Sequence, residues 1–404
     1  MKNTFRSLKQ YNYRTWAIGA LISNIGTWMQ RTAQDWLVLT ELTHHNATAV
    51  GIIMSLQFGP QILLLPVTGL AADHFDRRKL LFVTQTASGL LALALGVLTL
   101  TGSVRLGHVY LLALLLGCVS SFDTPARQAF VSDLVGEADL PNAVALNSTS
   151  FNAASMLGPA VAGFIIHVFG VGWAFLINAA SFLAVLASLL MLRQETLHAS
   201  ARPPRTGGQL LEGFRYVASR PDLKLALLMM FLISTFGINF PIFIATMDVA
   251  AFHAGAREYG VLTSVMAIGS VIGALLSASR TRLSLNILLI AALGFGATMA
   301  LAAIMPNLTG FGFALIGVGI ATQTFTTSTN SLVQLSSEPA MRGRVVAILF
   351  AITMGCTPLG APLVGWVADQ YGPRIALAVG ATSGLLAAFA AWIYLSGRNS
   401  TMSR

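Results

Sequence analysis

Two ionisable side chains in the first apolar segment of the chain have the chemistry for proton exchange. Arg31 and Asp35 stand four positions apart, so they lie on one face of a helix and can pair. Lipid penalises such charges by several kcal/mol each, so we expect this face to line a water-filled passage. There a carboxylate beside a guanidinium can exchange a proton for an organic cation, as an antiporter requires. A structural ion pair near the membrane surface is the alternative.

The same face carries uncharged polar residues at helical intervals of three and four positions. Burial disfavours the charged form of Asp35 and Arg31 favours it, so a movement of Arg31 would switch the protonation of Asp35. We therefore predict that Asp35 and Arg31 couple transport to protons. The polar members of the stripe are Asn24, Thr27 and Gln34, and Trp28, Trp36 and Phe58 add an aromatic wall. Of these, Asn24, Trp28 and Gln34 are predicted to face the substrate, while Trp36 also fits an aromatic belt at the membrane surface.

The composition places this segment in a membrane. Of the 404 residues, 55% are hydrophobic and 10% are charged, and the mean hydropathy is +0.72. Soluble proteins carry roughly 25% charged residues. Apolar runs of about 20 residues form helices in lipid, because lipid offers no partner to free backbone groups. The first run is too long for the core of a cleaved signal peptide, so the sequence predicts a multi-pass membrane protein.

The basic residues predict the topology. The formal net charge is +9. With twelve spans and both termini in the cytoplasm, all but four of the 24 Lys and Arg residues face the cytoplasm, as the positive-inside rule demands. The charge therefore indicates orientation and not nucleic-acid binding. The four exceptions are Arg31, Arg105, Arg257 and Arg374.

The apolar runs follow a repeat. Four glycines, each predicted to end an apolar helix and each followed by a similar stretch, are 94, 110 and 92 residues apart by subtraction. These intervals indicate a unit of roughly three spans used four times. The four glycines are Gly69, Gly163, Gly273 and Gly365. The predicted spans cover 14–40, 49–72, 80–101, 108–128, 142–168, 171–192, 223–248, 257–279, 285–305, 308–331, 343–368 and 374–396.

The longest interval contains a charged stretch with prolines and a short amphipathic run. We therefore predict an N-terminal six-helix bundle over 1–192, a cytoplasmic linker with an interfacial helix over 193–222, and a C-terminal six-helix bundle over 223–404. The predicted fold class is an all-α membrane protein, with twelve transmembrane helices in two pseudo-symmetric six-helix bundles.

Polar groups in other spans are candidates for a gate and for the substrate cavity. Asp123 and Arg127, four positions apart, predict either a gate that pairs with Arg77 or an ion pair that stabilises a helix end. Amides and hydroxyls are dense in spans seven and ten, where they either line the cavity or bond between helices. The amide candidates are Asn239, Gln323 and Asn330.

Other chemistries lack support in the sequence. It contains no GxxxxGK[ST] loop for ATP, and no HExxH or GxSxG motif. Cys118 and Cys356 both lie in spans and are interpreted as packing residues. We expect no enzyme activity, no cofactor and no metal.

One loop carries a family resemblance. Gly69-Leu-Ala-Ala-Asp73-His-Phe-Asp-Arg77-Arg78 resembles the loop between spans two and three of the major facilitator superfamily, G-x-x-x-D-R-x-G-R-R/K. Histidine and aspartate replace the usual arginine and glycine at positions 74 and 76. The resemblance implies the major facilitator fold and a gate held by Asp73 and Arg77, with Asp123 as the partner of Arg77. The implied gate residues are Gly69, Asp73, Arg77, Arg78, Asp123 and Arg127.

Span five resembles the antiporter motif G-x8-G-x3-G-P-x2-G-G of the same superfamily. It keeps Gly158, Pro159 and Gly163, and alanine replaces glycine at positions 145, 154 and 162. This pattern is similar to the efflux branch of drug:proton antiporters, which includes the enterobactin exporter and macrolide efflux proteins. It implies export and not import.

The predicted function is secondary active export of a small amphipathic compound, such as a drug or siderophore, by proton antiport. The predicted partners are the small-molecule substrate, protons and the lipid bilayer, without ATP or nucleic acid. The predicted location is the bacterial cytoplasmic (inner) membrane. A proton-coupled importer or a uniporter is the alternative within transport. A membrane receptor or assembly partner that moves nothing is the alternative outside it.

Overall fold

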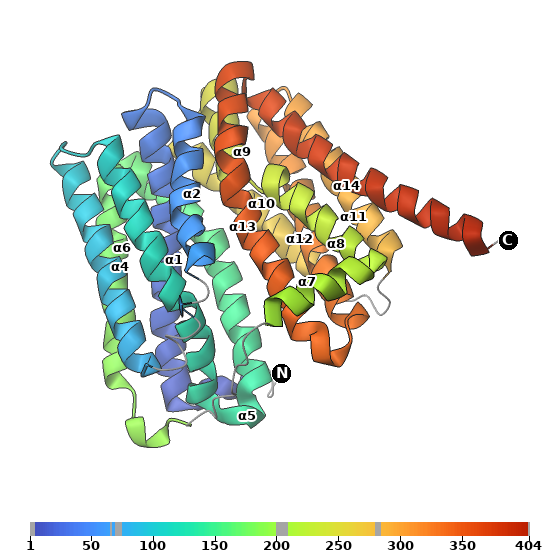
Figure 1. Ribbon diagram of the computed structural model, residues 1–404. Coiled ribbons are helices and arrows are strands. Elements are labelled where there is room, and N and C mark those ends of the chain that lie inside the picture. The colour runs from blue at the N-terminus through green and yellow to red at the C-terminus, as the bar shows by residue number, and fades with distance from the viewer. Residues whose placement is uncertain (1–4, 65–66, 69–74, 199–208, 279–283, 403–404) are drawn as a thin grey trace. The chain divides into compact units, whose positions relative to one another are not determined.

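The computed structural model of the chain describes residues 5–64, 67–68, 75–198, 209–278 and 284–402, and throughout these residues the regular elements are helices (Figure 1). Two predicted gate residues, Gly69 and Asp73, lie outside the described ranges.

Contacts between Cα atoms divide the chain into two compact units. Unit 1 comprises Met1–His44, Leu56–Pro204 and Gly255–Ser264, and unit 2 comprises His45–Ser55, Arg205–Ala254 and Val265–Arg404. The main division, after Pro204, falls inside the predicted linker. In addition, each unit includes one short segment from the other half of the chain.

Unit 1 is built on four long helices that bury the polar stripe. The helix that carries this stripe, α1, packs against α5 and α6, and α4 packs against the same two helices. A turn of π-helix, Leu37–Leu42, continues the stripe helix beyond its last α-helical residue. The four helices are α1 (Tyr11–Trp36), α4 (Arg77–Leu100), α5 (Leu106–Phe169) and α6 (Val171–Met191), and α2 (Ala47–Leu63) contributes its second part to this unit.

The long helix α5 supplies two membrane crossings. Its backbone leaves the helical region at Gly136, where φ is 69° and ψ is 177°, so the chain kinks there. The two parts correspond to the predicted spans 108–128 and 142–168. The core beside this kink contains Tyr13, Trp16 and Phe130.

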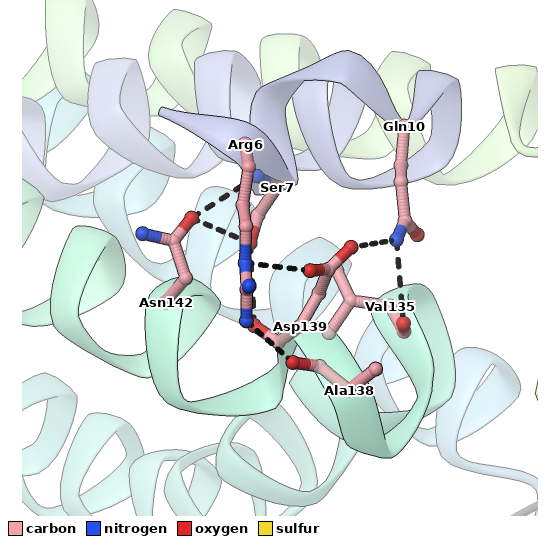
Figure 2. A network of polar contacts seen from close by, with 7 residues as sticks. All are labelled: Arg6, Ser7, Gln10, Val135, Ala138, Asp139 and Asn142. Carbon is pink, nitrogen blue, oxygen red and sulfur yellow. Dashed lines mark hydrogen bonds and ion pairs between the residues drawn. The ribbon is translucent and has the colours of Figure 1, made fainter. Parts of the chain in front are cut away.

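The chain near the N-terminus is fastened to the second part of α5 (Figure 2). A 3-10 turn, Arg6–Lys9, precedes α1. The Arg6 guanidinium pairs with Asp139 at 2.7 Å, and Gln10 donates to the same carboxylate at 2.7 Å. The Ser7 hydroxyl donates to the Asn142 side-chain oxygen at 2.8 Å. These bonds hold the start of α1 against α5. The polar stripe lies further along the same helix.

Unit 2 contains the remaining helices. A helix, α7, lies within the predicted linker, and its Glu212 pairs with Arg344 of α13 at 2.7 Å. The seventh span is interrupted by π-helical turns at Ile233–Gly237 and Met247–Ala251. The helices are α7 (Gln209–Ser219), α8 (Pro221–Leu232), α9 (Phe240–Thr246), α10 (Ala256–Ala278), α11 (Leu285–Ile304), α12 (Leu308–Ser336), α13 (Pro339–Tyr371) and α14 (Pro373–Met402). The first turns of α10 belong to unit 1.

The predicted twelve spans are present. Within the described residues, nine helical stretches are long and apolar enough to cross a membrane, with α5 counted once and α8–α9 counted together. The second part of α5, α1 and α2 complete the set. The polar stripe lowers the hydropathy of α1, and α2 has only 17 described residues.

The repeat is real, but its glycines were assigned the wrong role. Gly163 and Gly365 do not end helices, because α5 continues to Phe169 and α13 continues to Tyr371. Gly273 likewise lies inside α10. The helices end seven residues later, at Gly170 and Gly372, whose φ and ψ angles are 92° and 162°, and 90° and 164°. Only glycine adopts such positive φ values without strain, so these two turns are equivalent in the repeat.

Gly163 and Gly365 instead allow close helix crossings within each unit. A Cβ atom on Gly365 would lie 2.5 Å from the Ala47 carbonyl oxygen, and one on Gly163 would lie 2.7 Å from the Ala256 carbonyl oxygen. The start of α2 therefore packs on α13 in unit 2, and the start of α10 packs on α5 in unit 1.

An aspartate of α13 also caps the start of α2. The Asp369 carboxylate accepts hydrogen bonds from the Ala47 and Thr48 backbone N–H groups at 2.6 and 2.9 Å, and from the Thr48 hydroxyl. The Asn46 side chain accepts from the next free group, the Ala49 N–H, at 2.9 Å. A helix start has unpaired N–H groups and a partial positive charge, and this arrangement satisfies both.

Asp369→Ala should destabilise the protein, because the substitution leaves two N–H groups at the start of α2 without their acceptor. The loss of a helix cap costs about 1 kcal/mol. We expect a lower apparent melting temperature for the purified protein in detergent, with Gln370→Ala, an exposed neighbour on the same helix, unchanged. Equal melting of the two variants would contradict the capping role.

Candidate functional site

The polar stripe of α1 is enclosed within unit 1. The Gln34 and Asp35 side chains are 2% and 8% exposed, although both are polar. Burial of polar groups costs free energy unless they find partners. The partners of the stripe therefore show what it can do.

Arg31 is held by aromatic rings. Its guanidinium carbon lies 5.1 Å from the centre of the Trp28 ring and 5.3 Å from that of Phe58. Ring faces attract cations, most strongly where water is excluded. The predicted aromatic wall is thus partly formed, since Trp28 also packs edge-on against Phe151 at 5.6 Å. Its occupant is the guanidinium.

Asp35 is held by a tyrosine that the sequence did not single out. Tyr259 and Arg31 are the polar side chains that neighbour the Asp35 carboxylate. The Tyr259 ring also stacks on Trp36, with centroids 5.9 Å apart and planes at 25°. Trp36 therefore packs inside unit 1 instead of only marking the membrane surface. The available signal was a tyrosine within an apolar span, but nothing in the spacing links it to α1.

The polar stripe of α1 is hydrogen-bonded to α5 at Asn24. The Asp123 carboxylate pairs with Arg127 at 3.1 Å and accepts from Thr84 and Gln85 of α4 at 2.7 and 2.6 Å. Arg127 in turn donates to the Asn24 side-chain oxygen at 3.3 Å. The predicted Asp123–Arg127 pair is thus present, and it joins α4, α5 and α1.

The predicted partner of Arg77 was wrong. Arg77 pairs with Asp133 at 2.7 Å, whereas Asp123 binds the groups just described. Ten residues of helix separate the two aspartates, about 15 Å along the axis, so one arginine cannot reach both. Arg78 donates to the Leu189 backbone carbonyl at 2.9 Å. Both arginines therefore fasten the start of α4 within unit 1.

The motif residues of span five lie against α1 and the start of α10. A Cβ atom on Gly158 would lie 2.5 Å from the Trp28 Cβ and 3.0 Å from the Met29 nitrogen. Pro159 is buried next to it. Together with Gly163, these small residues let two elements approach the backbone of α5 closely: α1, which carries Asp35, and the start of α10, which carries Tyr259.

The candidates in unit 2 make hydrogen bonds to residues four positions away in the chain. The Asn239 side chain donates to the Thr235 carbonyl at 2.8 Å, at the break between π-helical turn and α9. Gln323 donates to the Thr327 hydroxyl at 3.2 Å, and Asn330 accepts from Gln334 at 2.9 Å, both within α12. These bonds each lie within a single span, so they are not the hydrogen bonds between helices that the sequence offered as the alternative to a cavity lining.

The chain matches a family of membrane transporters over almost its full length. The profile described as "Transmembrane secretion effector" matches residues 2–400. The staphyloferrin A transporter of Staphylococcus aureus is 27% identical over 354 residues, covering 86% of this chain and 87% of its own. The multidrug efflux pump Tap of Mycolicibacterium fortuitum is 27% identical, covering 87% and 88%. The enterobactin exporter of Shigella boydii is 28% identical, covering 86% and 83%.

Solved structures agree in fold. The nucleoside transporter NupG superposes with a TM-score of 0.75 at 15% identity, covering 95% of this chain and 98% of that one. A D-xylose–proton symporter superposes with a TM-score of 0.71 at 13% identity, covering 94% and 97%. The polar stripe and the repeated helices thus belong to a transporter and not to an enzyme. The chain is a member of the transmembrane secretion effector family of the major facilitator superfamily.

Proposed function

We propose that this protein exports a small amphipathic compound, a drug or a siderophore-like molecule, in exchange for protons. One observation carries the proposal: a carboxylate, Asp35, is buried beside Arg31 on a membrane-spanning helix of unit 1. Three similar proteins, named a staphyloferrin A transporter, a multidrug efflux pump and an enterobactin exporter, support the substrate class. The proposed location is the bacterial cytoplasmic membrane, with both termini in the cytoplasm.

In the proposed mechanism, Asp35 takes up and releases the proton. The ionised carboxylate is stabilised by Arg31 and by the Tyr259 hydroxyl, and the neutral acid needs neither. Because aromatic rings and not a second carboxylate hold the guanidinium, Arg31 can shift relative to Asp35 without leaving its ring contacts. A shift of this kind during transport would change the proton affinity of the site.

Substrate contacts are proposed for the same stripe. The Gln34 amide nitrogen is buried and has no hydrogen-bond acceptor among the described residues. A buried donor without an acceptor costs free energy. We therefore propose that a hydrogen-bond acceptor of the substrate binds to the Gln34 amide. Asn24 and Trp28 complete this set, and Asn239, Gln323 and Asn330 are the candidates in unit 2.

We propose a gate at the start of α4 and along the part of α5 that precedes its kink. Two ion pairs stand there, Arg77–Asp133 and Asp123–Arg127. Arg77 of the first pair is part of the family-like sequence that ends at Arg78. Gly69 and Asp73 are proposed to act with these pairs, as the family resemblance implies.

Asp35→Asn should abolish proton-driven export, because the amide cannot bind and release a proton. The measurement is flux in proteoliposomes with an imposed pH gradient, using a compound that the wild-type protein moves. Glu41→Gln is the matched control, since it removes an exposed carboxylate six residues further along the chain. Wild-type flux in the Asp35→Asn variant would refute the coupling role. The direction of flux also separates export from import, and flux that ignores the gradient would indicate a uniporter.

Exchanging the charges of Arg77 and Asp133 should test the observed pair. Either single alanine substitution removes this ion pair from a largely buried charge and should cost about 1–3 kcal/mol of unfolding free energy. The double exchange Arg77→Asp with Asp133→Arg should recover part of the lost thermal stability. The double exchange Arg77→Asp with Asp123→Arg should recover none, and recovery in that variant would favour the pairing first expected from the sequence.

A further inference from the structure

Two aromatic rings of unit 1 hold a cation that belongs to the chain itself. The Arg31 guanidinium carbon lies 5.1 Å from the centre of the Trp28 ring and 5.3 Å from the centre of the Phe58 ring. Trp28 belongs to α1 and Phe58 to α2, so two helices supply these rings, which we call the ring pair. Phe151 of α5 supports the ring pair, because its ring packs edge-on against Trp28 with centroids 5.6 Å apart.

The guanidinium rests on the ring pair without a polar partner. Among the described residues, Arg31 makes no hydrogen bond and no close ion pair. The other arginines of unit 1 that lie near the stripe differ, because Arg77 pairs with Asp133 and Arg127 pairs with Asp123. N–H donors without acceptors cost free energy. Arg31 is therefore easier to displace from its place than an arginine that is fixed by a carboxylate.

The chemistry of the ring pair selects cations. Ring faces attract positive charge, and they suit weakly hydrated, delocalised cations such as guanidinium best. Resting on the export proposed above, we propose that the ring pair binds a delocalised organic cation of the substrate, and that Arg31 occupies this site while the substrate is absent. A substrate of this class brings flat apolar surface in addition to its charge. It thereby gains contacts with the rings that the guanidinium does not make.

The displaced guanidinium has a partner within reach. Asp35 follows Arg31 by four positions on α1, the spacing at which two side chains of a helix can pair. The substrate cation takes the rings, and Arg31 turns to the carboxylate. An anionic substrate would act in the opposite sense, because it would bind the N–H groups of Arg31 and leave the rings occupied.

Charged groups on the neighbouring elements are engaged elsewhere. On α5, Asp123 and Arg127 pair with each other at 3.1 Å. At the start of α10, the Glu258 carboxylate accepts a hydrogen bond from the backbone of its own helix start at 3.1 Å, and Arg257 is exposed. The competition for the ring pair is therefore between Arg31 and the substrate.

Equilibrium binding of ethidium, a flat delocalised cation, to the purified full-length protein tests the site without transport. Arg31→Met removes the competing cation and keeps a long side chain. We expect this variant to bind ethidium roughly fivefold to thirtyfold more tightly than the wild type, because two ring contacts become available. Lys79→Met is the matched control, since it removes an exposed positive charge at the start of α4, and it should leave the affinity unchanged.

Substitution of the rings separates displacement from simple charge repulsion. Phe58→Leu and Trp28→Leu should each weaken ethidium binding, and Arg31→Met should no longer tighten it in either background. Two separate ring variants keep the test valid if one of them fails to fold, which the melting temperature shows. Tightening that persists without the rings would mean that Arg31 only repels cations and would overturn the inference. So would a folded Arg31→Met variant that binds no ethidium.

Salicylate, a flat aromatic anion, tests the opposite charge. We expect Arg31→Met to bind salicylate no more weakly than the wild type. Salicylate binding that is present in the wild type and lost in Arg31→Met would show that Arg31 anchors an anionic substrate, and the inference would be wrong.

The outcomes for this inference and for the proposed function are separable. If Asp35→Asn stops proton-driven flux and Arg31→Met binds ethidium like the wild type, the inference is wrong and the proton coupling stands. If Asp35→Asn transports like the wild type and Arg31→Met binds ethidium more tightly through the rings, the proton coupling is wrong and the cation site stands.

Discussion

The cost of placing charge inside a membrane-spanning helix governs this structure. Arg31 and Asp35 cannot be left to lipid, so protein groups must surround them. The Arg31 guanidinium lies against two aromatic rings, and the Asp35 carboxylate lies beside Tyr259. Neighbouring backbones also come very close to α5 in this region. The glycines of span five make that approach possible, because a Cβ atom on Gly158 would collide with Trp28.

The repeat shows how one helical unit can serve different tasks. The turns at Gly170 and Gly372 have the same backbone angles, and Gly163 and Gly365 receive the starts of α10 and α2 in equivalent crossings. The side chains at the two helix crossings differ in chemistry. In unit 2 the crossing ends on a carboxylate, Asp369, that caps a helix. In unit 1 the corresponding position is His167, four residues after Gly163 as Asp369 is four residues after Gly365.

Hydropathy and spacing predicted the helices well and the long-range pairs poorly. The predicted spans 285–305 and 171–192 agree within a residue with Leu285–Ile304 and Val171–Met191, because membrane thickness and short loops fix both ends. Pairs four positions apart, such as Asp123 and Arg127, follow from helix geometry alone. Contacts between distant helices do not: Arg77 binds Asp133, and Tyr259 reaches Asp35 from over two hundred residues away.

Proton release upon ligand binding tests the central claim most directly. A compound that the wild-type protein transports is added to the purified protein in weakly buffered detergent solution, and the pH is followed. The account predicts that binding releases a proton from the wild-type protein and that the release disappears in Asp35→Asn. Binding without proton release, or an equal release from the Asp35→Asn variant, would contradict it.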